Sequence, residues 1–351
     1  MSPRTVASIS TSARENDNMA SIKDMIPAFE LYQPASVDDA LDLLDEHRSE
    51  AWVLAGGLDS FDWFKDRIKR PTAVVDLGAI DELKGIRVPD EGGLEIGAMT
   101  SLTEIVRDER VRSQYSLLAT AAEHVATPQI RNQGTVGGNV SQDTRCWYYR
   151  AGWPCYRAGG NTCYAAAPQA MNREHCIMGR SRCVAINPSD TAPALIALDA
   201  KMIVRSARRT NVHDAEDFFI GPSIDITRMT VVKSTDLLTK IHIPAIWANA
   251  DFYYEKVTDR GSWDFQLVSV AAAFKMSGNT IEEARIAVNG VAPYPVRLGA
   301  VERLVAGSRA NEDTADAAGE LAIEGARALR HNDYKIPLMR NLVRRAVRSV
   351  A

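Results

Sequence analysis

Five cysteines lie in one segment, and the sequence contains no others: Cys146, Cys155, Cys163, Cys176 and Cys183. Thiolates bind zinc and iron–sulfur clusters, and thiols can also pair as disulfides. An odd count leaves one thiol over in any disulfide scheme, and no pair has the short spacing of a structural zinc knuckle. A 4Fe-4S cluster accepts any four thiolates that converge on it. The spacing alone does not decide between zinc and such a cluster.

Two glycine-containing segments indicate a different chemistry. The first is the run Val53, Leu54, Ala55, Gly56, Gly57, Leu58, Asp59 and Ser60. The second is the run Thr135, Val136, Gly137, Gly138 and Asn139. Glycine permits positive φ and lets backbone N–H groups approach a ligand closely, which suits a pyrophosphate. A structural turn uses the same residues, and the first segment is not the G-x-G-x-x-G of a Rossmann site. Together, the two turns could clasp one extended dinucleotide.

Asp190 follows Pro188 and Ser189, directly before a helix-like run. Its carboxylate could cap that helix at Thr191. It could equally accept hydrogen bonds from the hydroxyls of a bound flavin or adenosine. The two roles are compatible, and the sequence around Asp190 favours neither.

The elements that must position these residues follow from periodicity and capping. Ser36 is a good N-cap, Ser101 and Glu104 form a capping box, and 244–249 looks like a linker. Strands are predicted over 52–55, 73–77, 94–97, 201–206, 237–243, 266–276 and 281–288. Helices are predicted after Ser36 and over 101–125 (with a break near Ser113), 192–198, 298–306, 314–329 and 338–350.

Composition excludes several partners. The chain has 351 residues, 25% of them charged and 46% hydrophobic, as in ordinary globular proteins, and this length suffices for two domains. Its formal net charge of -4 predicts neither nucleic acid nor an anionic membrane as partner. No apolar run reaches the roughly 18 residues of a membrane span. Residues 1–25 are polar and Ser-rich, so we expect a flexible extension and no signal peptide.

These motifs carry a resemblance to a known family. The run 55–60, the run from Pro128 to Asn139 and the triplet 188–190 resemble the three FAD-binding segments of the flavin subunits of molybdenum hydroxylases, the xanthine dehydrogenase and carbon monoxide dehydrogenase family. The resemblance extends from about Ile26 to the C-terminal tail. It implies an α+β fold: a vanillyl-alcohol-oxidase-type FAD-binding domain in two subdomains, 26–246, then a small α/β C-terminal domain, 250–350.

The resemblance also implies site residues. The run from Val53 to Ser60 resembles the first pyrophosphate-binding loop, and Asp190 matches the acidic FAD ligand. Further matches to flavin-contacting positions are Val125, Thr135, Leu237 and Lys256. Leu58 departs from the family pattern, in which many members carry a small hydroxyl residue.

The cysteine segment resembles an insertion found in some members. Cys146, Cys155, Cys163 and Cys183 look like the four-cysteine insertion of the flavin subunits of periplasmic aldehyde oxidoreductases, which implies a 4Fe-4S cluster on these four thiolates. Cys176 matches an apolar position, so we expect a spare buried thiol. The inserted iron–sulfur loop is predicted to span 142–186.

The function implied is that of an FAD- and 4Fe-4S-containing electron-transfer subunit. Substrate, an aldehyde or a related compound, would be oxidised on a molybdopterin-binding large subunit. Electrons would pass through a 2Fe-2S small subunit to FAD and on to an external acceptor, so no catalytic residue is nominated. The rival functions are a stand-alone flavin oxidoreductase and a zinc-stapled interaction subunit without redox activity. The complex would be periplasmic by co-export with a signal-bearing partner, or cytoplasmic.

Overall fold

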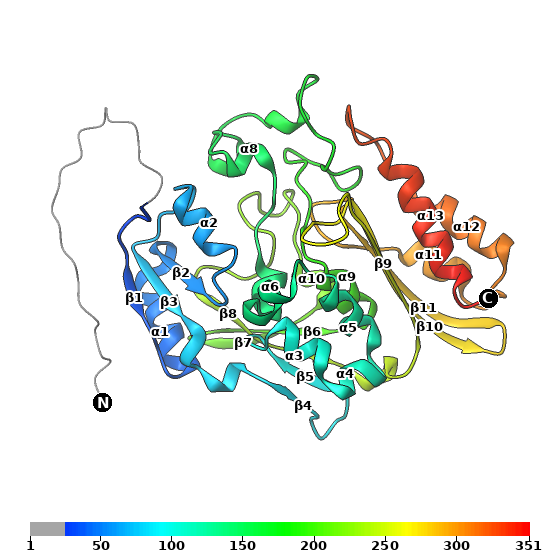
Figure 1. Ribbon diagram of the computed structural model, residues 1–351, viewed down its shortest axis with the longest axis horizontal. Coiled ribbons are helices and arrows are strands. Elements are labelled where there is room, and N and C mark those ends of the chain that lie inside the picture. The colour runs from blue at the N-terminus through cyan, green and yellow to red at the C-terminus, as the bar shows by residue number, and fades with distance from the viewer. Residues whose placement is uncertain (1–24) are drawn as a thin grey trace.

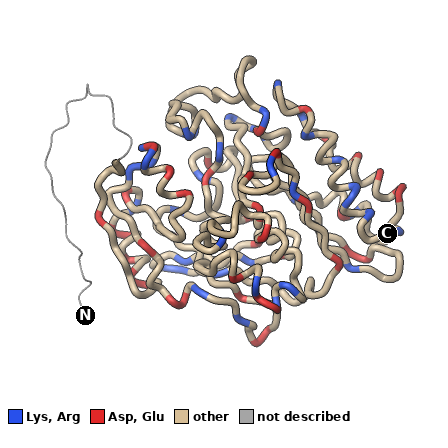
Figure 2. Tube along the Cα trace, viewed as in Figure 1, with Lys and Arg blue, Asp and Glu red and all other residues tan. Residues whose placement is uncertain are grey.

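The computed structural model describes residues 25–351, which form three sheets with helices packed between and around them (Figure 1). The predicted extension, 1–25, lies outside the described residues except for Met25. Residues of both charge signs are interspersed along the traced chain (Figure 2). None of the helices in residues 25–351 combines the length and the apolar character that a bilayer crossing requires.

The first sheet is parallel and built from two successive strand–helix–strand units. Its strands, in spatial order, are β1 (Glu30–Tyr32), β3 (Ala73–Asp76) and β2 (Ala51–Leu54). The connecting helices are α1 (Val37–His47) and α2 (Ser60–Lys65). The predicted cap of α1 is confirmed, because the Ser36 hydroxyl accepts from the Asp39 N–H at 3.1 Å. The first glycine segment is the connection from β2 to α2.

The second sheet is antiparallel. Its strands, in spatial order, are β4 (Ile86–Arg87), β5 (Leu94–Gly97), β8 (Asp236–Ile243), β6 (Lys201–Ser206) and β7 (Arg209–Asp214). The helices of this part are α3 (Leu102–Arg107), α4 (Glu109–Gln114), α5 (Ser116–Glu123), α6 (Pro128–Gln133), α7 (Val136–Ser141), α8 (Trp147–Arg150), α9 (Thr191–Ala197) and α10 (Ala215–Phe218). The capping box at the start of α3 is confirmed.

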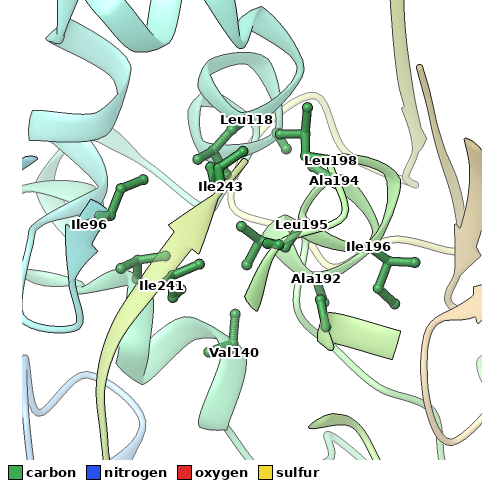
Figure 3. Close-up of a cluster of buried hydrophobic side chains, with 14 of the residues drawn as sticks. Ile96, Leu118, Val140, Ala192, Ala194, Leu195, Ile196, Leu198, Ile241 and Ile243 are labelled. Carbon is green, nitrogen blue, oxygen red and sulfur yellow. The ribbon is translucent and has the colours of Figure 1, made fainter. Parts of the chain in front are cut away.

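Helix α7 carries the second glycine segment, and helix α9 directly follows Asp190. Both helices are anchored in one apolar core. Figure 3 shows Val140 of α7 and Leu195 of α9 in this core, with Ile241 of β8. All three side chains are fully buried. The candidate site residues on these two short helices are therefore held by the same packing.

The third sheet is antiparallel, and its two central strands are largely buried on both faces. Its strands, in spatial order, are β12 (Val296–Arg297), β11 (Thr280–Asn289), β10 (Val268–Ser277) and β9 (Asp251–Val257). Along β10, Ala271 and Ala273 join the core of α9, whereas Val270 and Phe274 join a second core on the other face. Strand side chains alternate between faces, so this continuous apolar run serves two cores. The second core is covered by α11 (Gly299–Val305), α12 (Glu312–Ala322) and α13 (Lys335–Arg348).

Several predicted elements differ from the structure. The helical region 101–125 is divided twice, at Asp108 and at Tyr115, rather than once near Ser113. The predicted linker 244–249 contains a 3-10 turn whose Trp247 is fully buried, so it packs as part of the core. The predicted helix 314–329 is shorter, ending at Ala322, shortly before Gly325, which has a φ of 75°. The second glycine segment is not a turn but the first turn of α7, with Thr135 as its N-cap.

Candidate functional site

A cavity of about 620 Å³ opens where the first glycine segment, α7 and the loop before α9 meet. This volume lies within the range of small-molecule and cofactor sites. Sequence-predicted residues that line it are Val53, Ala55, Gly56, Gly57, Leu58, Asp59, Ser60, Val125, Thr135, Gly138, Asn139 and Asp190. The fold thus brings together residues that are far apart in the sequence.

The first glycine segment offers free donors to this cavity. Gly57 has a φ of 78°, which only glycine adopts readily. A Cβ on Gly56 would lie 2.2 Å from the carbonyl oxygen of Gln133, so the close packing of these segments also requires glycine. The backbone N–H groups of Gly57, Leu58 and Asp59 have no acceptor within the described residues. These groups are available to a ligand oxygen.

The second glycine segment does not offer free amides, contrary to expectation. The N–H of Gly137 donates to the Ala98 carbonyl at 2.9 Å, and the N–H of Gly138 donates to the Thr135 hydroxyl at 3.1 Å. The N–H of Asn139 donates to the Thr135 carbonyl at 2.9 Å. These donors are used because the segment is helical and capped. Its contribution to the cavity is the exposed Gly138, together with Thr135 and Asn139.

The Asn139 side chain is oriented by two hydroxyls. Its Oδ1 accepts from the Ser189 hydroxyl at 2.7 Å and from the Thr191 hydroxyl at 2.6 Å. Because the oxygen is held on the protein side, the amide nitrogen remains for the cavity that Asn139 lines. Ser189 also caps α9 by accepting from the N–H of Ala192 at 3.1 Å.

Asp190 therefore does not cap α9 with its side chain. Its Oδ2 accepts from the Lys256 ammonium at 2.7 Å, in an ion pair whose side chains are each only 4% exposed. Its Oδ1 is buried without a partner in the described part of the chain. Burial raises the pKa of Asp190 to about 6, although the charge of Lys256 opposes this shift. A buried acceptor without a partner, on the wall of a cavity, suits a donor from a ligand.

Four predicted contacts do not line the cavity. Lys256 is held behind Asp190 by the carbonyls of His124 and Asp264, at 2.9 and 2.8 Å. Leu237 packs against α1 in a separate core, because it projects from the face of β8 that α1 covers. The other two are Leu54, which packs with the aromatic residues of α2, and Gly137, whose added Cβ would meet the Ala98 carbonyl at 2.7 Å.

Sequence reasoning missed cavity residues that come from distant segments. Aromatic side chains reach it from Trp52, Trp63, Trp263 and Phe265, and cationic ones from Lys69, Arg145, Arg157 and Arg228. No short motif marks them, and only the fold places them around one space.

The cysteine loop is tied to the first glycine segment through Asp59. The Asp59 Oδ1 accepts from Arg145 at 3.0 Å and from Arg150 at 2.5 Å. Its Oδ2 accepts from the indole of Trp63 at 3.0 Å. Arg145 and Arg150 thus fix the loop beside the cavity.

The four cysteines of the predicted ligand set line a second, small cavity of about 10 Å³, which has room for about one water molecule. They are Cys146, Cys155, Cys163 and Cys183, and all five cysteines of the chain are free thiols. Three tyrosines, Tyr148, Tyr149 and Tyr164, also line it. Within residues 25–351, no group of three or more histidine, cysteine or acidic side chains is arranged to hold a metal ion.

Cys176 differs from the other four thiols in its surroundings. It does not line the cavity but is fully buried beside it, in a cluster with Val184 and Ile186 against which Cys146 and Cys163 also pack. Burial raises the pKa of Cys146 and of Cys176 to about 12. The neighbouring His175 places its Nε2 3.3 Å from the sulfur of Cys146.

The start of α13 holds the cysteine loop from the other side. Asn332 donates to the carbonyls of His175 and Cys176 at 2.8 and 3.2 Å. The Lys335 ammonium donates to the carbonyls of Glu174 and Gly290 at 3.0 and 2.7 Å. Lys335 is fully buried, and burial lowers its pKa to about 7.

Comparison with known proteins identifies the family. Residues 27–246 match the family model of the FAD-binding domain in molybdopterin dehydrogenase, and 252–350 match that of the CO dehydrogenase flavoprotein C-terminal domain. The chain belongs to the FAD-binding subunits of the molybdenum hydroxylases. The resemblance seen in the sequence is confirmed, and so is the expected fold class.

Individual relatives of this flavin subunit support the same family assignment. It is 36% identical over 269 residues to the aldehyde oxidoreductase FAD-binding subunit PaoB of Escherichia coli, covering 75% of this chain and 82% of that one. It is 29% identical over 327 residues to the carbon monoxide dehydrogenase medium chain of Hydrogenophaga pseudoflava, covering 92% and 96%. A solved structure of carbon monoxide dehydrogenase from that organism, lacking the Mo-pyranopterin moiety, superposes with a TM-score of 0.74 at 27% identity, covering 93% of this chain and 98% of that one.

Proposed function

We propose that this flavin subunit also carries a 4Fe-4S cluster and serves electron transfer in a molybdenum-dependent dehydrogenase for aldehydes or related substrates. The observation that carries the proposal is that four cysteines line one cavity, whereas Cys176 packs beside this cavity and does not line it. One relative, a FAD-binding subunit, is named for an aldehyde oxidoreductase, which supports the substrate class.

FAD would occupy the 620 Å³ cavity. The free N–H groups of Gly57, Leu58 and Asp59 suit the pyrophosphate, because its oxygens need several convergent donors. The buried Oδ1 of Asp190 suits a ribityl or ribose hydroxyl, and Gly138 leaves room for close approach. When bound, the flavin supplies the redox chemistry, while this chain orients it and sets its surroundings.

Lys256 would act through Asp190 rather than on the flavin. Its ammonium satisfies one carboxylate oxygen of Asp190, which lines the cavity, and leaves the other oxygen without a partner among the described residues. The pair therefore presents an acceptor of fixed position.

The cluster would take its thiolates from Cys146, Cys155, Cys163 and Cys183. The donor set suits it, since four cysteines are the usual ligands of a 4Fe-4S centre and no carboxylate lines their cavity. The cavity is small, so the four side chains would have to spread to admit it. Their segments are loops and short helical turns, which no sheet holds in a fixed register.

In this proposal the partners are a molybdopterin-binding large subunit, a 2Fe-2S small subunit and an external electron acceptor. Electrons would arrive from the 2Fe-2S subunit and leave to the acceptor. Support comes from the relatives, which are named as medium chains and FAD-binding subunits. The FAD-binding domain would span 26–246, with the iron–sulfur loop 142–186, and the C-terminal domain 250–350.

A cysteine series tests the cluster. The full chain, produced with the neighbouring subunits and purified anaerobically, should contain iron and acid-labile sulfide beyond the amount that a 2Fe-2S partner contributes. Substituting Cys146, Cys155, Cys163 or Cys183 by alanine should remove that excess iron, because one iron loses its thiolate. Cys176→Ala should keep it, since it removes only a packed sulfur.

Two outcomes contradict this assignment. Excess iron that survives in one of the four variants but is lost in Cys176→Ala would show that the ligand set is wrong. Zinc without excess iron in the wild-type protein would favour the zinc-stapled interaction subunit.

A further inference from the structure

The flavin cavity and the cysteine cavity share a wall. Along residues 143–146 of the cysteine loop, which form neither helix nor strand, Asp143 and Arg145 line the flavin cavity, whereas Thr144 and Cys146 line the cysteine cavity. Successive residues of this stretch thus contribute alternately to the two cavities. A displacement of Cys146 therefore displaces residues that line the flavin cavity.

Arg157 lines both cavities and follows shortly after Cys155. Its side chain is only 4% exposed and donates to Asp143 at 2.5 Å and to the Ile226 carbonyl at 2.8 Å. Its Nε is buried and has no acceptor among the described residues. Buried donors are normally paired, so an acceptor supplied by a bound group in one of these cavities would satisfy Nε.

The charges around Arg157 come from both sides of the wall. On one side its guanidinium donates to Asp143 at 2.5 Å, and on the other side Arg157 lines the cysteine cavity together with Cys183. Asp143 belongs to the flavin side and Cys183 to the cysteine side. A deprotonated, metal-bound Cys183 would hold Arg157 in place more firmly than a neutral thiol does.

We infer that FAD retention depends on an occupied cysteine site, and that Arg157 is the positioning residue that links the two. The inference rests on the proposed cluster. With the thiolates bound to the cluster, Arg157 and the shared wall are fixed. Asp143 and Arg145 then keep defined positions beside the flavin. Without the bound group, the four thiols relax and the flavin cavity loses a defined wall. By linkage, FAD should in turn stabilise the cysteine site.

The test measures the FAD dissociation constant, by flavin fluorescence, in the full chain within its co-purified complex. Wild-type protein is compared before and after its iron is removed with a chelator, and in Cys183→Ala. Iron removal and Cys183→Ala should each weaken FAD binding by about tenfold, within the usual range of coupling between two sites. Iron analysis accompanies each sample.

Two variants, Arg157→Gln and Lys69→Gln, distinguish the loss of the connection through Arg157 from the mere loss of a positive charge near Asp143. Both side chains approach Asp143, Lys69 at 3.9 Å, but Lys69 lines only the flavin cavity. In Lys69→Gln, iron removal should still weaken FAD binding by about tenfold. In Arg157→Gln, FAD should bind weakly whether or not iron is present, because the link is already broken.

Two results would overturn the inference, and a third would overturn the proposed cluster. An unchanged FAD dissociation constant in iron-free wild-type protein would show that the sites are independent. Full sensitivity to iron in Arg157→Gln would show that Arg157 is not the link. Wild-type protein without any excess iron would instead overturn the proposed cluster itself, so the two failures are distinguishable.

Discussion

At the scale of single residues, neighbours in the sequence have separate tasks. Gly137 is needed because the backbone of Ala98 lies against it, whereas Gly138 is exposed on the cavity wall. Asp190 and Ser189 likewise have different roles: Ser189 caps α9, whereas Asp190 lines the cavity and keeps one buried carboxylate oxygen without a partner in the described part of the chain. Residue type alone does not distinguish these roles.

Replacing Asp190 tests its proposed contact with FAD. Asp190→Ala should weaken FAD binding by roughly 1–3 kcal/mol, because a ligand hydroxyl loses its acceptor. The change also leaves the Lys256 ammonium buried without its carboxylate, which by itself destabilises the fold. Released-FAD fluorescence measures flavin occupancy, and thermal unfolding measures stability.

The double variant Asp190→Ala, Lys256→Met is the matched control for this effect. Removing both charges should restore much of the stability but none of the FAD affinity. Wild-type flavin occupancy in the double variant would show that Asp190 only balances the charge of Lys256.

At the scale of elements, the cysteine loop is held between two anchors. Asp59, just before α2, binds two of its arginines, and the start of α13 binds the backbone around Cys176. Figure 1 shows the segment of α8 lying between these regions. The two ends of a loop with little regular secondary structure are thereby attached beside the cavity.

Lys335 should make this anchoring depend on pH. Its pKa is about 7 in the folded protein, against an ordinary value of 10.5. Between these values the unfolded chain binds more protons than the folded one, so the Lys335 contribution to stability increases as the pH rises. Lys335→Met leaves two buried carbonyls unpaired, at a cost of roughly 1–3 kcal/mol, and removes this dependence.

Thermal unfolding at pH 7 and pH 9 checks this expectation. Lys335→Met should be more destabilising at pH 9 than at pH 7. Lys275, which pairs with Glu283 on the surface, provides the control, and Lys275→Met should have the same small effect at both pH values. An equal loss at both pH values in Lys335→Met would mean that Lys335 is not neutral in the folded protein.

At the scale of the whole molecule, the two matched domains meet at the site. The bond between Lys256 of β9 and Asp190 joins the segment matched by the C-terminal family model to the FAD-binding one, and so does the bond from Asn289 to the Ser189 carbonyl at 2.7 Å. The cysteine loop contacts both segments. We therefore expect flavin binding to report on the integrity of the entire chain.

The proposed electron-transfer role predicts what this chain does without its partners. Purified alone with FAD bound, it should not oxidise aldehydes with artificial acceptors, because substrate oxidation requires the molybdopterin-binding subunit. The reconstituted complex should oxidise them. Substantial aldehyde turnover by the single chain would favour a stand-alone flavin oxidoreductase.

The sequence by itself determined whatever depends on a few neighbouring residues. The Ser36 cap, the capping box of α3 and the apolar strand β10 follow from local hydrogen bonding and side-chain alternation, and the structure confirms them. The grouping of the site segments came from their resemblance to a family, whose shared fold holds these segments at one cavity.

Only the tertiary structure decided how each group is used. The sequence around Gly137 could not reveal that its N–H is paired with Ala98, since that partner belongs to another segment. Leu237 has the right residue type for a flavin contact, but the placement of α1 buries it elsewhere. The free oxygen of Asp190 and the shared wall at Arg157 likewise arise from long-range contacts, because burial and pairing are properties of the folded chain.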